Sequence, residues 1–265
     1  MYEFGVKSPA SIDDVKTALG EAEDGQFLAG GQTLIPVLKQ RLAMPSDLIS
    51  LGRVGELSGI KVSGDSISIK AMTTHAAVAA DGDVKSAIPA LAKLAGGIGD
   101  PHVRNRGTIG GSIANNDPAA DYPAAVLGLG ATVVTTEREI AADNFFTGMF
   151  DTSLKEGELI TEVVFPIPEV AAYIKFPNPA TRYALVGVMV AKNGNTVRVA
   201  VTGAGPCVFR VPEMEQALTA SFSPDSIKDG MVADDDLNND IHASGNYRAH
   251  LIGVLARRAV AEANG

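Results

Sequence analysis

The chain lacks residue types that several classes of protein depend on. It has one cysteine, Cys207, and no tryptophan among 265 residues. A single cysteine forms no internal disulfide and cannot alone ligate an iron–sulfur cluster or build a structural zinc site. No pair of its four histidines has ligand spacing, so we expect no metal site. Such sparing use of cysteine is typical of a reducing compartment, and we expect a cytoplasmic protein.

Positive charge and long apolar runs are also scarce. The net charge of −9 excludes the basic surface that binding to nucleic acid or to an anionic membrane needs. The longest apolar stretch, residues 123–134, is too short and too broken by glycine to span a bilayer. The first residues show no basic-then-apolar leader. We therefore expect no nucleic-acid partner and no transmembrane segment.

The common catalytic and nucleotide-binding motifs are missing as well. The sequence contains no Gly-x-Gly-x-x-Gly, no Gly-Lys pair, no Cys-x-x-Cys, no His-Glu-x-x-His and no Gly-x-Ser-x-Gly. Their absence disfavours Rossmann, P-loop, dithiol, zinc-protease and serine-hydrolase proteins. Any demanding chemistry would then belong to a cofactor.

Glycine, by contrast, is abundant, with 28 residues. Two segments pair adjacent glycines with a hydroxyl: the first glycine segment, residues 29–33, and the second glycine segment, residues 108–112. Glycine lets main-chain N–H groups approach an anion, and a helix starting after Thr33 would add its positive end. A pyrophosphate is the natural ligand, although an isolated Gly-Gly turn more often binds nothing. The stretch 96–118 around the second segment is predicted to be a long, ordered and therefore functional loop.

Periodicity indicates two domains of mixed helix and strand. Apolar patterns predict helices at 12–19 and 88–95 and strands at 27–29, 65–71, 131–136 and 159–165. Pro166 and Pro168 mark a linker, so we place a boundary near residue 169, between domains 1–169 and 170–265. Beyond it, predicted strands at 183–191 and 196–202 flank an Asn-Gly turn, and an amphipathic helix closes the chain.

Several single residues are open to two interpretations. Tyr183 either packs in the core, the commoner case, or stacks on a flat ring. Asp117 and Asp121 could form an acid–base pair, but Asp121 more simply orients a ligand hydroxyl or caps the following helix. Arg104 and Arg106 are as consistent with surface ion pairs as with a phosphate or a partner's acidic face.

At this point two long runs resemble a known family, the FAD-binding medium subunits of the xanthine dehydrogenase and carbon monoxide dehydrogenase group of molybdenum hydroxylases. Residues 29–45 resemble its first flavin motif and residues 96–123 its second. The resemblance continues at 72–75, 157–160 and 247–251, and so covers essentially the whole chain.

The resemblance implies an α+β fold. Its first part would be a two-subdomain FAD-binding domain of the vanillyl-alcohol-oxidase-like (PCMH) type, with the subdomains dividing near residue 58. A smaller C-terminal α+β domain with a three-stranded antiparallel sheet would follow.

It also implies a set of FAD contacts. The matching positions are Ala29, Gly30, Gly31, Gln32, Thr33, Leu34, Thr108, Ile109, Gly110, Gly111, Ser112, Asn115, Asp121, Ile160, Lys175 and Tyr183. The last three match positions near the flavin ring, and no residue is assigned as catalytic. Related oxidases can bond flavin covalently to a histidine in the first loop. Gln32 stands in that loop here, so we expect FAD that dissociates.

The function implied is electron transfer within a larger enzyme. A large subunit would oxidise carbon monoxide, an aldehyde, a purine or an N-heteroaromatic at a molybdenum-pterin centre. A small subunit would carry two [2Fe–2S] clusters, and FAD would pass electrons to an external acceptor, in a dimer of heterotrimers. The alternatives are a stand-alone FAD-dependent oxidase or reductase of the same fold, and a scaffold without redox turnover. The sequence identifies neither substrate nor acceptor.

Overall fold

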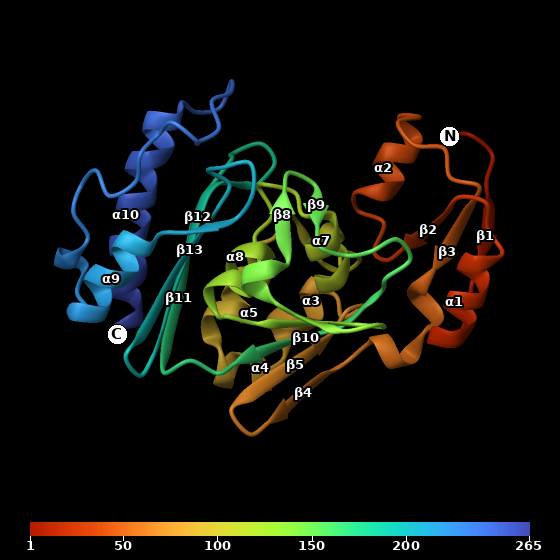
Figure 1. The fold of residues 1–265 in the computed structure, drawn as a ribbon, viewed down its shortest axis with the longest axis horizontal. Coiled ribbons are helices and arrows are strands. Elements are labelled where there is room, and N and C mark those ends of the chain that lie inside the picture. The colour runs from red at the N-terminus through yellow and green to blue at the C-terminus, as the bar shows by residue number, and fades with distance from the viewer.

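The structure is a computed structural model that describes residues 1–265. Figure 1 shows three neighbouring groups of elements in chain order: a small N-terminal group in red and orange, a central group in brown, yellow and green, and a C-terminal group in blue-green and blue. No helix combines the length and the apolar character needed to cross a bilayer.

The N-terminal group is a parallel sheet with strand order β1-β3-β2. It contains β1 (Gly5–Lys7), α1 (Ile12–Gly20), β2 (Gly25–Leu28), α2 (Leu34–Lys39) and β3 (Asp47–Ser50), followed by the short turns η1 (Leu51–Arg53) and η2 (Gly55–Leu57). Parallel strands need crossover connections, and the two helices supply them. The Ser11 hydroxyl accepts the N–H of Asp14 at 3.1 Å and caps α1, the helix predicted at 12–19.

The central group is an antiparallel sheet with strand order β4-β5-β10-β6-β7. Its strands are β4 (Ile60–Ser63), β5 (Ser66–Lys70), β6 (Thr132–Thr135), β7 (Glu139–Ala141) and β10 (Ile160–Pro166). Its helices are α3 (His75–Ala80), α4 (Gly82–Ala87), α5 (Pro89–Gly96), α6 (Pro101–Arg104), α7 (Ile109–Asn115) and α8 (Tyr122–Gly128). The turn η3 (Ala142–Asn144) and the small hairpin β8 (Phe146–Gly148) and β9 (Asp151–Thr152) complete it.

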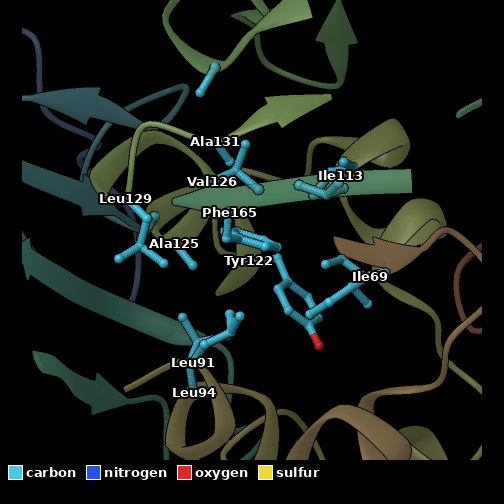
Figure 2. Close-up of a cluster of buried hydrophobic side chains, with 14 of the residues drawn as sticks. Ile69, Leu91, Leu94, Ile113, Tyr122, Ala125, Val126, Leu129, Ala131 and Phe165 are labelled. Carbon is cyan, nitrogen blue, oxygen red and sulfur yellow. The ribbon is translucent and has the colours of Figure 1, made fainter. Parts of the chain in front are cut away.

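Apolar side chains from these strands and helices meet in one core. Figure 2 shows Tyr122 from α8 lying among Ile69 of β5, Ile113 of α7 and Phe165 of β10, and all four residues are fully buried. The packing of α8 against both α7 and α5 holds the second glycine segment close to the sheet.

The C-terminal group is an antiparallel sheet with strand order β11-β12-β13-β14. It contains β11 (Val170–Pro177), β12 (Ala184–Asn193), β13 (Thr196–Thr202), β14 (Phe209–Arg210), α9 (Pro212–Ala220), η4 (Pro224–Ser226) and α10 (Gly245–Ala263). Val188 and Val199 belong to a core beneath α10, whereas Tyr173, Met189 and Ala200 join the central core. The sheet is therefore buried on both faces, which explains the nearly continuous apolar run of β12.

Most predicted elements are present, with one correction. The hairpin around Asn193-Gly194 and the closing helix appear as β12–β13 and α10, and the three long antiparallel strands are joined by a two-residue fourth, β14. The stretch 96–118 is not a long loop, because it contains α6 and α7. Asp100 and Thr108 cap these helices by accepting main-chain N–H groups. The loop prediction was wrong because it relied on the glycines and overlooked these two N-cap residues. The divisions near residues 58 and 169 stay predictions.

Candidate functional site

A cleft lies between the N-terminal and central groups. It has a volume of about 670 Å³, within the usual range of roughly 300–1,000 Å³ for ligand pockets. In Figure 1 it corresponds to the region between α2 and β2 on one side and α3 and α7 on the other. Both glycine segments contribute to its walls, so residues about eighty positions apart in the chain face one space.

The first glycine segment connects β2 to α2 and presents unpaired main-chain donors. The N–H groups of residues 30–34 have no acceptor within the protein, and the first bonded amide is that of Ile35, which donates to the Gly31 carbonyl. Gly31 has φ of +71°, a left-handed conformation that glycine adopts without steric cost. A run of free amides in such a turn is a concave donor site suited to an anion.

The second glycine segment is different, because its amides are used inside the protein. Those of Ile109 and Gly110 donate to the carbonyls of Thr73 and Ala71, at 3.1 and 2.9 Å. That of Gly111 donates to the Thr108 hydroxyl at 3.2 Å, and that of Ser112 donates to the Thr108 carbonyl. We expected backbone donors from both segments, but only the first leaves a run of consecutive amides free. The second segment begins α7, and its amides hold that helix against the end of β5.

Glycine in and next to the second segment serves close packing instead. A Cβ added to Gly110 would lie 2.6 Å from the Cβ of Ala71, and one added to Gly111 would lie 3.3 Å from the Cβ of Ala29. A Cβ on Gly30 would lie 2.1 Å from the carbonyl oxygen of Arg106. The two glycine segments therefore touch through positions where a side chain would force them apart.

Below the cleft, Asp121 forms a buried cluster. Its carboxylate accepts the Tyr173 hydroxyl at 2.6 Å and the Lys175 ammonium at 3.0 Å, and Lys175 also donates to the Gly97 carbonyl at 2.9 Å. Burial raises the pKa of Asp121, and the neighbouring ammonium and phenol oppose that shift. Asp121 does not cap α8 through its side chain, so that part of the prediction was wrong. Its oxygens are engaged by the C-terminal sheet.

Asp117 and Tyr183 line the same cleft. One carboxylate oxygen of Asp117 accepts the Ala119 N–H at 2.9 Å, and no hydrogen bond joins Asp117 to Asp121. Tyr183 is 46% exposed, which excludes the core interpretation. Burial and the two nearby carboxylates raise the pKa of Tyr183, so its phenol stays protonated.

The two loop arginines do not reach the cleft. Arg104 donates to the carbonyls of Ile98 and Gly99 at 3.0 Å each, and neither Arg104 nor Arg106 lines the walls. Arg104 therefore stabilises the turn between α5 and α6. The hypothesis of a direct phosphate contact receives no support from their placement.

Glu158 is a cleft residue that the sequence did not single out. Its carboxylate accepts Arg138 at 3.0 Å, the Thr135 hydroxyl at 2.7 Å and the Lys155 N–H at 2.8 Å. These donors lower its pKa to about 2, with the hydrogen bond from Arg138 as the largest cause. Glu158 thereby holds the loop before β10, and this loop carries the wall residues Leu154 and Leu159.

The structure brings most predicted site residues together. All of those that match the family's flavin contacts line the cleft except Ile109 and Lys175. Ile109 is fully buried in the central core, and Lys175 lies behind Asp121. Gly107, Asp117 and His75 also line the cleft. Of these, His75 falls in the matching run 72–75, and its contact with the second segment depends on the pairing of Thr74 with Thr108.

Comparison with known proteins agrees with this geometry. Residues 2–168 match the family described as the FAD binding domain in molybdopterin dehydrogenase. The chain belongs to this family. The nicotine 6-hydroxylase medium subunit of Paenarthrobacter nicotinovorans is 37% identical, with 97% of this chain and 95% of the relative covered. The carbon monoxide dehydrogenase medium chain of Hydrogenophaga pseudoflava is 33% identical, with 97% and 96% covered.

The solved structures show the same relationship. The reconstituted CO dehydrogenase from Oligotropha carboxidovorans contains a chain that superposes with a TM-score of 0.90 at 31% identity, covering 99% of this chain and 98% of that one. The predicted family, fold class and class of enzyme, an oxidoreductase subunit, are therefore confirmed. The cofactor of this family is FAD, and the cleft fits it. The free amides of the first segment suit its pyrophosphate, and the cleft is large enough and carries an aromatic side chain for its ring.

Proposed function

We propose that this chain is the FAD-containing electron-transfer subunit of a heteromeric molybdenum hydroxylase. It would take electrons from [2Fe–2S] clusters in a small partner subunit and pass them to an external acceptor. The observation that carries the proposal is the cleft itself, where two glycine segments converge and residues 30–33, whose N–H groups are free, line one wall. The relatives named medium subunit or medium chain support the role.

Each wall has a task in binding the cofactor. The amides of the first glycine segment would hold the pyrophosphate, and Ile160 and Tyr183 would lie beside the flavin ring. The buried pair of Asp121 and Lys175 would support the ring from below without direct access for Lys175. The cofactor supplies the redox chemistry, so these residues bind, orient and exclude water rather than act as acid, base or nucleophile.

The partners follow from the same proposal. A large subunit with a molybdenum-pterin centre would oxidise the substrate, a small subunit would carry the clusters, and the assembly would be a cytoplasmic dimer of heterotrimers. Two relatives with similar identity to this chain are named for nicotine and for carbon monoxide. Features shared with both therefore do not select the substrate, which would be chosen in the large subunit.

The test compares the purified chain with the reconstituted complex. We would measure reduction of a dye acceptor with carbon monoxide, aldehydes and N-heteroaromatic substrates. We expect the chain to bind FAD and to be reoxidised by acceptors after chemical reduction, yet to oxidise none of these substrates until both partner subunits are added. Substrate turnover by the single chain at the rate of the complex would instead establish a stand-alone flavoenzyme.

A further inference from the structure

His75, at the start of α3, has a buried ring without a partner. The residue is 5% exposed, and its Nδ1 is buried and makes no hydrogen bond. The ring lies 5.3 Å from that of Tyr122, whose hydroxyl is also unpaired. Buried polar atoms are nearly always hydrogen-bonded, and each exception calls for an explanation.

The surroundings of the ring indicate which nitrogen carries the proton. A proton on Nδ1 would be a buried donor without an acceptor, which is costly. The proton therefore lies on Nε2, the nitrogen next to Gly107. A Cβ at residue 107 would lie 2.5 Å from Nε2 and would clash with it. Glycine at this position therefore allows the His75 ring to line the cleft.

The place of His75 links it to both glycine segments. Its main-chain N–H donates to the Gly107 carbonyl at 3.0 Å. On the other side, a Cβ on Gly30 would lie 2.8 Å from the Cα of Gly107. Gly107 therefore stands between the imidazole and the start of the free amides. An anion bound by those amides would therefore be separated from Nε2 only by the backbone of Gly107.

The second glycine segment needs a donor from elsewhere. Its amides from Ile109 to Ser112 are all bonded within the protein, so these four offer nothing to an anion, and a side chain on that side of the cleft can supply the missing donor. We propose that His75 is a cofactor-binding residue whose neutral imidazole donates a hydrogen bond from Nε2 to a pyrophosphate oxygen of FAD. The inference rests on the proposed placement of FAD in this cleft.

The electrostatics are consistent with a neutral donor. Burial, followed by the positive charge of Arg104, lowers the pKa of His75 to about 4. The ring therefore stays uncharged at neutral pH. Its hydrogen bond would orient the pyrophosphate without placing a positive charge beside it.

The experiment titrates apoprotein with FAD and follows the quenching of flavin fluorescence. His75→Phe keeps a flat ring but removes the donor, and we expect FAD binding to weaken roughly 10- to 100-fold, the usual effect of losing a hydrogen bond to a charged group. His75→Gln, which restores an N–H donor, should recover most of the affinity. His102→Phe is the matched control, since His102 is exposed and outside the cleft, and should bind as the wild type does.

Two further measurements separate the outcomes. ADP has the pyrophosphate but no flavin, so its binding should weaken by the same factor in His75→Phe. Unchanged ADP binding would overturn the pyrophosphate assignment. If His75→Phe does not fold, the ¹⁵N resonances of His75 in the wild type decide: FAD should shift Nε2, and an unmoved Nε2 overturns the proposal. Wild-type protein that binds no FAD would refute the proposed function. Wild-type affinity in a folded His75→Phe would refute this inference alone.

Discussion

The contact between the first glycine segment and residues 106–107, just before the second, makes Gly30→Ala a sharp test of the site. A Cβ there would lie 2.1 Å from the carbonyl oxygen of Arg106 and 2.8 Å from the Cα of Gly107, where ordinary contacts begin at 3.4 Å. Both neighbours are backbone atoms and cannot swing aside as a flexible side chain would. The segments must separate by about an ångström, and overpacking of this kind costs about 1–3 kcal/mol.

We expect two measurable effects from this separation. The midpoint of urea unfolding of the apoprotein should fall by roughly 0.3–1 M, given a slope of about 3 kcal/mol per M for a chain of this size. The dissociation constant of FAD should rise at least about tenfold, because displaced amides lose the alignment that a charge-assisted hydrogen bond needs. Both quantities come from one preparation, by fluorescence during urea and FAD titrations.

The control is Gly20→Ala. Gly20 is the last residue of α1, and a Cβ added there meets no atom within 4 Å. This change should leave FAD binding unaltered and should hold or raise stability, by up to about 1 kcal/mol. If Gly30→Ala unfolded at the same urea concentration as Gly20→Ala and bound FAD within twofold of wild type, the close approach of the segments and its role would both be wrong.

Two other predictions concern stability and the cofactor linkage. Arg138→Met should lower the free energy of unfolding at pH 7, because it leaves the buried Glu158 carboxylate without its main donor. Because the folded pKa of Glu158 is lowered to about 2 from 4.5, its contribution is complete above about pH 4.5 and is lost as pH falls towards 2. The stability gap between wild type and variant should therefore narrow from pH 6 to pH 3, and a gap independent of pH would contradict the assignment. Denaturing and ultrafiltering the holoprotein should send the yellow colour into the filtrate, since Gln32 offers no imidazole for a covalent link, and colour retained on the chain would show the opposite.

Local patterns predicted the elements with strong local signals. The capped helix α1, the Asn-Gly hairpin and the apolar stripe of α10 depend on neighbours a few residues apart, and the sequence displays those neighbours directly. The prediction for residues 96–118 was wrong because the glycines there suggested a loop, whereas helices begin after Asp100 and Thr108. In that stretch packing against β5 outweighs the low helix propensity of glycine.

The sequence by itself predicted a nucleotide-like cofactor at two glycine segments and assigned any metal chemistry to other chains. Both conclusions follow from residue types: glycines beside hydroxyls, and a single cysteine. Only the tertiary structure decided which segment donates. The two segments look alike in sequence, but the amides of residues 109–112 are used to fix α7, while those of residues 30–33 remain free. Acceptors for a main-chain N–H can come from any part of the chain, and that pairing exists only after the sheet has brought β5 and α7 together.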